Sequence, residues 1–528
     1  MKNLRRLAGV LGLSMLFASG CAAHPGPAPI AEEQPAGSTQ TSEPTPEVPA
    51  EKKNRDEIVV GIDPLKNGFN PHLVADDTTF VQSLANLVLP STFNDGRLND
   101  DMLLSAEEVA PAPGVAQTVR YRINEAAQWS DGAPITAADF TYLWTALRDE
   151  PAGVDTAGYA KIANVRSESG GKVVYVDFAT AEPLWQQLFQ HLLPSHLFTI
   201  GTDSFEKALA TTIPASGGKY MVRNVDRRRG VVELARNDRF WGTQPANVEL
   251  LTFREVTNTS QAVEMLRTQQ MAYLDISPTE TSNEALTLMA GAQVHTRSTQ
   301  RQLQLNFNTA VLGDIHQRQA LAGLIDIPQV ARLAAGRAAE LDIAAATTPE
   351  PGFLEQTKAQ FGRPIRISAD PADDEATTAA HVVAARLREA GFQVEVFATD
   401  FTDLTQKRLI GNNVDLSLSW AREPVNPLTA ATQTSCARAE NPTMPGNLSN
   451  YCSFELSERI AQWAAGGEQV DVAKELKDQA VVIPIMKDRR VEALGNGLIG
   501  PNQGFSQWPR GAMSGPIDTA AMWKKKVG

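Results

Sequence analysis

The chain has 528 residues, a formal net charge of −13, 42% apolar residues and three cysteines. At ~100–200 residues per domain, this length predicts two to four domains with substantial cores and excludes a peptide toxin or small disulfide-stapled module. The first twenty residues contain Lys2, Arg5 and Arg6 and no acid, so the remainder carries −16. No nucleic-acid partner is expected, because counterion release from phosphates needs an excess of Lys and Arg.

Residues 1–20 have the composition of a secretory signal peptide. A basic start precedes an apolar run over 7–17, which is too short to span a bilayer stably. Small residues at 18–20 end directly at Cys21, the arrangement of a lipobox, in which the thiol is lipidated before cleavage. An ordinary signal peptide with an incidental Cys is the alternative. We expect an extracytoplasmic protein that is lipid-anchored through Cys21 to the outer face of the cell membrane.

The segment 21–55 is predicted to be a tether between the lipidated cysteine and the folded part. It contains seven prolines among Ala, Ser, Thr and Glu, with almost no large apolar side chain. Such a segment cannot bury enough apolar surface to offset the entropy lost on ordering.

The other two cysteines, Cys436 and Cys452, enclose fifteen loop-like residues. In an oxidising compartment, a disulfide across such a loop stabilises by ~3 kcal/mol. A metal-binding pair is the alternative, but no His lies nearby to complete the site. We expect a disulfide, and we predict no metal and no cofactor.

Strand-like and helix-like segments alternate from Asp56 onward, the pattern of a mixed α/β protein. Residues 119–123 alternate apolar and polar side chains, which predicts a half-buried strand. A turn at 130–132 follows it. Residues 136–139 then resemble a capping box before apolar residues at helical spacing.

Two further units are predicted later in the chain. A hairpin is expected between 219–222 and 231–234. Within 364–420, strands alternate with a helix at 382–390, which predicts a β-α-β unit of a parallel sheet.

The sequence contains few patterns typical of enzymes, and no catalytic residue is predicted. The seven histidines are scattered, and no HExxH, Walker loop or GxSxG motif occurs in the mature chain. Residues 495–500 fit GxGxxG, but Pro501 follows and no βαβ unit surrounds them, so we interpret them as a loop. The four acids within 370–375 lack calcium-loop spacing, and we interpret them as a solvated turn that caps the following helix.

Residues 129–140 read WSDGAPITAADF. They resemble the WSDGxPxTAxDF signature of the family 5 extracytoplasmic solute-binding proteins, which are oligopeptide, dipeptide and nickel receptors of ABC importers. The resemblance covers residues 56–495. Further matches follow in the family's order at 70–72, 218–220, 236–241, 305–308, 318–321, Asp326 and 447–451.

The resemblance implies an α/β, two-lobed fold of the periplasmic-binding-protein type (type II, cluster C), with an extra domain inserted in the first lobe. By the same resemblance, lobe one comprises 56–94, 212–290 and 481–528. The inserted domain comprises 95–211, and lobe two comprises 291–480. Family members close their lobes around ligand.

Peptide receptors of this family carry W-x-x-D-Y-x-D-P in lobe two, and its first Asp pairs with the peptide α-amine. Residues 420–427 read WAREPVNP, with Glu423 in place of that Asp. The longer carboxylate and the neighbouring Arg422 argue against standard peptide binding. The ligand-binding residues that the resemblance implies are Trp420, Glu423, Asn426, Asn306 and Asn308.

Within the family, residues 68–73, 87–91 and 235–242 resemble the LpqW-type lipoproteins of mycobacteria and corynebacteria, which are linked to phosphatidylinositol mannosides and lipoarabinomannan. Our first hypothesis is a surface lipoprotein that binds a ligand or partner in the interlobe cleft and acts in envelope assembly. Its ligand would be a glycolipid, and its partner an envelope glycosyltransferase. The second is a receptor that delivers peptides to an ABC permease. An enzyme is a weaker third, because nothing places a nucleophile beside a base.

Overall fold

The computed structural model describes residues 56–198, 204–347, 351–437 and 444–526. The predicted signal peptide, Cys21 and the whole of the predicted tether lie outside the described residues, so these predictions stay predictions. Among the described residues, no helix combines the length and the apolar character needed to cross a membrane.

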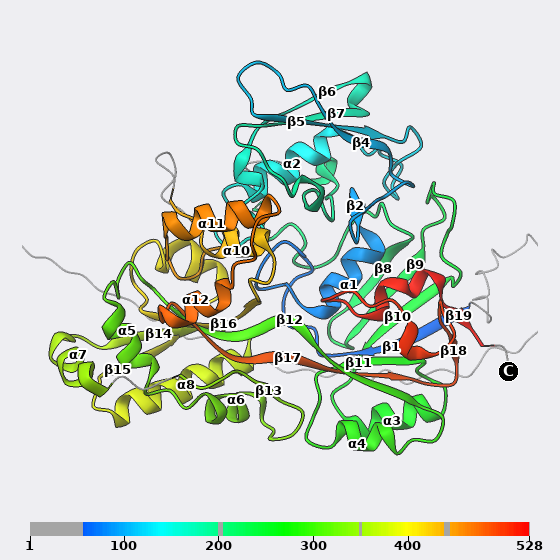
Figure 1. Ribbon diagram of the computed structural model, residues 1–528. Coiled ribbons are helices and arrows are strands. Elements are labelled where there is room, and N and C mark those ends of the chain that lie inside the picture. Colours follow the sequence, from blue (N-terminus) through cyan, green and yellow to red (C-terminus); the bar gives the residue numbers. More distant parts are fainter. Residues whose placement is uncertain (1–55, 199–203, 348–350, 438–443, 527–528) are drawn as a thin grey trace, which may run out of the picture. The chain divides into compact units, whose positions relative to one another are not determined.

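The described residues form a mixed α/β fold around an eleven-stranded sheet (Figure 1). Two long antiparallel strands, β12 (Gln293–Phe307) and β17 (Val482–Leu494), cross the middle of this sheet. We call the strands on the β12 side lobe two and those on the β17 side lobe one. Lobe two has β15 (Val394–Ala398), β14 (Ile365–Ala369) and β16 (Leu416–Arg422); lobe one has β11 (Tyr273–Ile276), β1 (Glu57–Ile62), β10 (Leu250–Glu255), β9 (Val231–Arg236) and β8 (Tyr220–Asp226); β13 (Asp342–Ile343) pairs with β17.

Lobe two contains the predicted parallel unit. Strand β14 pairs in parallel with both β15 and β16, and helix α8 (Asp374–Glu389) connects β14 to β15. The helix begins eight residues before the predicted start at 382, because the Asp373 carboxylate accepts a hydrogen bond from the Ala376 amide at 3.0 Å. The early turns of α8 pack through small alanines such as Ala376 and Ala380, so they carry little periodic apolar signal.

Lobe one combines parallel and antiparallel pairing. Strand β1 lies between β10 and β11 and is parallel to both. The predicted hairpin is confirmed as β8 and β9. Helix α1 (Thr79–Val88) is capped by Thr78 and is buried at nine of its ten positions, which places it inside the molecule rather than on its surface.

A separate four-stranded antiparallel sheet lies beside this core, at the top of Figure 1. The predicted strand at 119–123 falls within its strand β5, and helix α2 (Ala137–Leu147) begins with the predicted capping box. The Asp139 carboxylate accepts from the Thr136 amide at 2.9 Å, and the Thr136 hydroxyl accepts from the Ala138 amide at 3.3 Å. The strands are β4 (Leu103–Val109), β5 (Gln117–Ile123), β7 (Val173–Phe178) and β6 (Ile162–Glu168).

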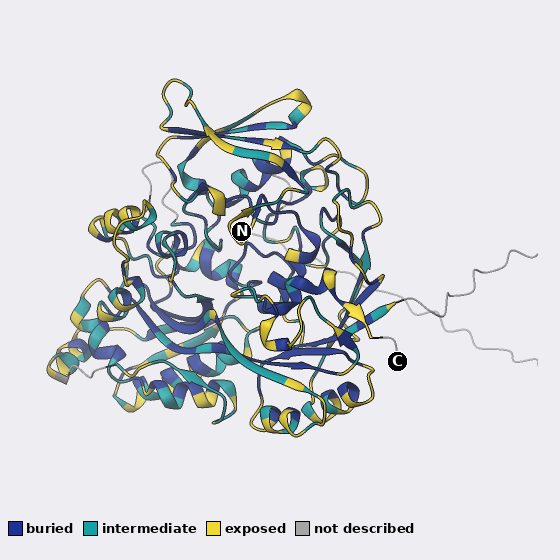
Figure 2. Cartoon of the chain, turned by 45° about the vertical axis from the view of Figure 1, so that its right-hand side comes forward, coloured by how far each residue is buried: buried dark blue, intermediate teal, exposed yellow. Residues whose placement is uncertain are grey.

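Most of the remaining elements are helices that pack on the sheets, and the inner faces of these helices are buried (Figure 2). The loop interpretation of 495–500 is confirmed, since a two-residue strand and turns occupy it and no α-helix follows in the described residues up to 526. The elements are α3 (Thr259–Arg267), α4 (Ser282–Thr287), α5 (Ile315–Ala322), α6 (Ile327–Ala335), α7 (Leu354–Gln360), α9 (Phe401–Asp403), α10 (Pro427–Gln433), α11 (Phe454–Ala464), α12 (Val472–Asp478) and the pairs β2 (Phe93–Asn94) with β3 (Arg97–Leu98) and β18 (Leu498–Ile499) with β19 (Lys524–Lys525).

The predicted disulfide is present between Cys436 and Cys452, with their Cα atoms 5.0 Å apart. It closes the loop between α10 and α11. The residue boundaries predicted for the two lobes and the inserted domain stay predictions.

Candidate functional site

A cavity of about 380 Å³ lies between the two lobes. Lobe one supplies residues 63–69 and the chain around the start of α1, and lobe two supplies 370–375, Phe401 and the end of β16. Arg301 of β12 and the β17 residues Asp488 and Arg490 complete the lining. Ligand pockets in proteins usually measure ~300–1,000 Å³, so this cavity suits a small ligand or part of a larger one.

Two carboxylates of the lining, one in each lobe, accept hydrogen bonds from backbone amides of their own lobe. Asp76 of lobe one accepts hydrogen bonds from the Gly68 and Asn70 amides at 2.9 and 3.0 Å. Burial nevertheless raises the pKa of Asp76 to about 6. Asp370 of lobe two accepts two backbone amides at 2.8 and 3.1 Å, and burial raises its pKa as well. Both side chains are therefore fixed in place and poorly solvated.

Glu375 lies in the first turn of α8, half-buried against the cavity. Burial raises its pKa to about 7, although Lys66 opposes this shift. Among the described residues, its carboxylate has no hydrogen-bond or ion-pair partner. The acids within 370–375 thus do cap α8 through Asp373, as predicted, but the interpretation as a solvated turn is incomplete. The turn faces lobe one across the cavity, a contact that no local sequence pattern reveals.

Arg301 and Trp420 lie together in the wall of the cavity. The guanidinium carbon of Arg301 is 5.0 Å from the centroid of the Trp420 ring, a cation–π contact. Trp420 is only 7% exposed, and the Nε atom of Arg301 is buried without a hydrogen-bond partner.

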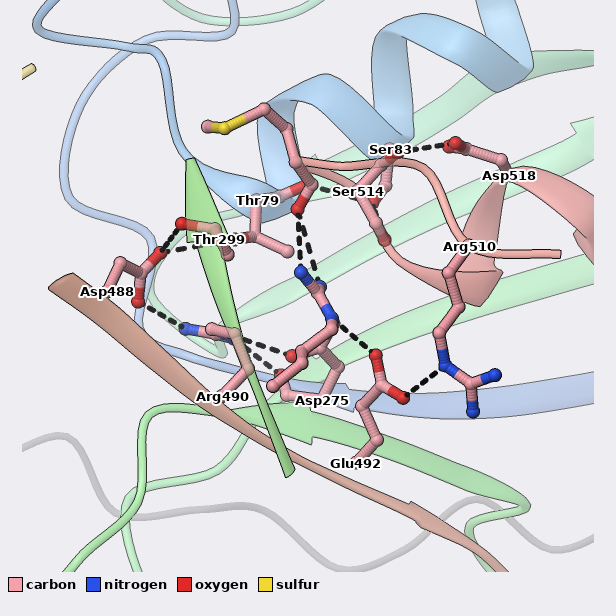
Figure 3. A network of polar contacts seen from close by, with 12 residues as sticks. Thr79, Ser83, Asp275, Thr299, Asp488, Arg490, Glu492, Arg510, Ser514 and Asp518 are labelled. Atoms are coloured by element: carbon pink, nitrogen blue, oxygen red, sulfur yellow. Dashed lines mark hydrogen bonds and ion pairs between the residues drawn. The ribbon is translucent and has the colours of Figure 1, made fainter. Parts of the chain in front are cut away.

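Arg490, in strand β17, is held by a network of polar side chains (Figure 3). It forms ion pairs with Asp63 and, at 2.8 Å, with Asp275. Burial alone would lower the pKa of Arg490, but these carboxylates raise it well above its usual range. Asp488 in turn accepts from the hydroxyls of Thr79 and Thr299 at 3.4 and 3.3 Å. Arg490 is therefore already saturated by protein carboxylates.

Four of the five predicted ligand residues lie outside this lining, and two of these, Glu423 and Asn426, follow strand β16. The Glu423 carboxylate pairs with the Lys487 ammonium at 2.8 Å. Asn426 caps α10, where its side-chain oxygen accepts from the Thr429 amide at 2.9 Å. Trp420 is the predicted residue that lines the large cavity.

The other two predicted residues are buried in strand β12 and the turn after it. Asn306 donates to the Ser419 hydroxyl at 3.2 Å and lines a separate space of only about 30 Å³. Asn308 donates to the Val414 carbonyl at 2.9 Å. The structure thus does not bring the five predicted residues into one site, and their role in binding stays a prediction.

The sequence analysis did not predict that Asp76 and the acids of 370–375 line one cavity, nor that Arg422 binds acids of other segments. Arg422 lies beside the small space and binds Asp77 and Asp155, which are distant in sequence. The only available signal was that Arg422 stands next to Glu423 in the ligand motif.

Comparisons with known proteins agree with this architecture. Residues 114–437 match the family model of bacterial extracellular solute-binding proteins, family 5 Middle. The chain is 28% identical over 506 residues to "Probable monoacyl phosphatidylinositol tetramannoside-binding protein LpqW" of Mycobacterium tuberculosis, covering 83% of this chain and 78% of LpqW. It is 27% identical over 229 residues to the oligopeptide-binding protein OppA of Mycobacterium bovis, covering 41% of this chain and 38% of OppA.

Among solved structures, the oligopeptide-binding protein AppA of Bacillus subtilis in complex with a nonapeptide superposes with a TM-score of 0.64 at 13% identity, covering 89% of this chain and 99% of AppA. This likeness supports the two-lobed fold. Because the family model matches more than half of the chain, the chain belongs to the bacterial extracellular solute-binding proteins of family 5.

Proposed function

We propose that this protein is a cell-surface lipoprotein of the LpqW type that binds a hydroxyl-rich ligand between its lobes. Its role would be in the assembly of phosphatidylinositol mannosides and lipoarabinomannan, with an envelope glycosyltransferase as partner and Cys21 as membrane anchor. Binding without catalysis is part of the proposal.

The observation that carries the proposal is the composition of the cavity wall. Several of its carboxylates have no cation within 4 Å among the described residues, and aromatic rings stand beside them. The carboxylates are Asp76, Asp370, Asp373, Asp374 and Glu375, and the rings are Phe69, Phe80, Phe401 and Trp420.

This wall suits a sugar or another polyol. Hydroxyl groups donate short, charge-assisted hydrogen bonds to carboxylates, and the apolar face of a sugar ring packs on aromatic side chains. A half-buried carboxylate without a partner is costly to ionise, so ligand hydroxyls would relieve that cost at Glu375. The name of the relative LpqW, a probable monoacyl phosphatidylinositol tetramannoside-binding protein, describes a mannoside ligand of this chemical class.

Peptide delivery to an ABC permease is the alternative, favoured by the partial likeness to OppA. The contact between Glu423 and Lys487 argues against it. A peptide amine would have to displace Lys487, which already lies 2.8 Å from the Glu423 carboxylate.

Calorimetry on the Cys21→Ala chain tests the proposal, with methyl α-mannoside, mannobiose and myo-inositol against di- to pentapeptides. We expect binding of the polyols and no micromolar peptide binding. Asp370→Asn together with Glu375→Gln should weaken polyol binding at least tenfold, whereas Glu355→Gln, on an 84% exposed side chain of α7, should not.

A different result would replace the proposal. Tight peptide binding with lobe closure, weakened by ~1.5–3 kcal/mol in Glu423→Gln, would identify a peptide receptor. In cells, deletion of the gene should change the phosphatidylinositol mannoside profile if the envelope role is right.

A further inference from the structure

Arg301 differs from Arg490 and Arg422, the two arginines already described between the lobes. Arg490 pairs with Asp63 and Asp275, and Arg422 pairs with Asp77 and Asp155. Within the described part of the chain, no carboxylate oxygen lies within 4 Å of the Arg301 guanidinium. Its side chain also makes no hydrogen bond there, and its Nε is buried. Arg301 is thus a permanent cation in the cavity without a counter-ion.

The surroundings of Arg301 orient its guanidinium. Its guanidinium carbon lies 5.0 Å from the centroid of the Trp420 ring, and this cation–π contact restrains the position of the group. The terminal nitrogens of a guanidinium form a fork that matches the oxygens of phosphate or carboxylate. A stacked arginine with an unused fork is ready to bind such an oxyanion.

We propose that Arg301, stacked on Trp420, is the anchor for a phosphate group of the ligand that fills the interlobe cavity. The exposed Lys66, on the facing segment of lobe one, adds a second positive charge to the lining. This assignment rests on the proposed function for the polyol part of the ligand, but the oxyanion contact stands on the geometry of Arg301 alone.

The carboxylates and the arginine of the cavity then bind different parts of the ligand. The carboxylates of 370–375, which have no cation within 4 Å in the described part of the chain, take hydroxyl groups, and Arg301 takes the phosphate. Partial protonation of Glu375 near pH 7 reduces the negative charge that the phosphate meets. The ligand class is therefore a polyol phosphate, such as an inositol phosphate headgroup. Inorganic phosphate alone should bind weakly, because it gains none of the hydroxyl contacts.

Calorimetry on the Cys21→Ala chain with myo-inositol 1-phosphate, myo-inositol and inorganic phosphate tests the anchor. We expect the inositol phosphate to bind at least tenfold more tightly than inositol. Arg301→Gln should abolish this preference and leave the affinity for inositol within twofold. Arg301→Lys should restore part of it, because lysine keeps the charge but lacks the planar fork. Arg332→Gln, an exposed arginine of α6, is the matched control and should change nothing.

An experiment with lipid vesicles distinguishes two sources of the phosphate, a lipid headgroup and a soluble ligand. Capture of the chain by vesicles that contain phosphatidylinositol, but not by pure phosphatidylcholine, would identify a lipid headgroup. Binding of free inositol phosphate without capture would identify a soluble ligand. In both cases the binding must fall in Arg301→Gln for the anchor to hold.

Equal affinity for inositol and its phosphate, a preference that survives Arg301→Gln, or no binding of any of the three probes would each overturn the anchor. If mannosides bind but the phosphate is not preferred, the anchor fails and the proposed function stands. If the phosphate is preferred but mannosides do not bind, the proposed function fails and the anchor stands. Melting curves check folding. If Arg301→Gln does not fold, Arg301→Lys tests the anchor, because it should reduce the preference for the phosphate without abolishing it.

Discussion

Arg422 of lobe two is joined to Asp77 of lobe one by two parallel hydrogen bonds, from Nε to Oδ2 at 2.8 Å and from Nη2 to Oδ1 at 2.9 Å. Its Nη1 atom reaches Asp155, between α2 and β6, at 2.6 Å. Burial alone would lower the pKa of Arg422, but the two carboxylates raise it above its usual range. One side chain thus links both lobes and the segment that leads into the separate four-stranded sheet, without help from a ligand.

Breaking this link should open the lobes. In Arg422→Gln, Asp77 loses its cation while its side chain remains 3% exposed, so we expect a loss of about 3 kcal/mol in the free energy of unfolding. X-ray scattering should show a larger radius of gyration. Arg267→Gln, which removes an exposed pair with Glu264, should cost less than 1 kcal/mol. An unchanged radius and an unchanged unfolding midpoint in Arg422→Gln would show that the link is not structural.

The disulfide should stabilise the contact between the α10–α11 loop and the chain near residue 155. The Thr156 hydroxyl donates to the Pro445 carbonyl at 3.1 Å, and the Gly446 amide donates to the Pro151 carbonyl at 3.1 Å. Replacing Cys436 and Cys452 by alanine should lower the free energy of unfolding by ~3 kcal/mol. Denaturant titration measures this loss. In the unfolded, unreduced Cys21→Ala chain, thiol titration should find no free cysteine, and two free thiols would contradict the pairing.

Glu375 should make the protein less stable as the pH rises. Its pKa is about 7 in the folded protein against 4.5 ordinarily, because burial penalises the charged form. Between these values the folded state binds more protons than the unfolded state, so stability falls from pH 4.5 to pH 7. Melting temperatures at pH 5 and pH 8 should differ less in Glu375→Gln. Glu389→Gln, at the exposed end of the same helix, should keep the wild-type difference.

His72 and His191 should make the protein less stable as the pH falls, which is the opposite of the effect of Glu375. Burial lowers their pKa values to about 4 and about 3, and the His72 ring nitrogen lies 3.0 Å from the His191 carbonyl. Below pH 6.5 the unfolded state therefore binds more protons, and stability is lost as the pH falls. Each histidine contributes up to ~1.4 kcal/mol per pH unit in this window. In unfolding titrations from pH 7 to pH 5, His191→Gln should reduce the slope, and the exposed His381→Gln should not.

Cys21→Ala should release the chain from the membrane. The described residues contain no helix that could hold it there, and the predicted lipid on Cys21 is the expected anchor. Fractionation should find the variant in the soluble or secreted fraction. Persistence in detergent-free membrane pellets would point to another means of attachment.

Local features were predictable because neighbouring residues encode them. The capping box at Thr136 and Asp139, the hairpin of β8 and β9 and the parallel unit around α8 follow from contiguous patterns. The family signature at 129–140 is such a pattern as well, which is why the family could be inferred from the sequence. The early start of α8 was missed because small alanines, and not large apolar residues, pack its first turns.

The cavity was decided by the tertiary structure. Arg301 and Trp420 belong to adjacent strands, and Arg422 and Asp77 are 345 residues apart, so neither contact has a local signal. The same holds for the acids of 370–375. Their sequence predicts only a solvated turn, and the tertiary structure places lobe one opposite them. Residue type and spacing specify turns, caps and strands through short-range forces. Which charges become neutralised, buried or left without a partner depends on the packing of distant segments.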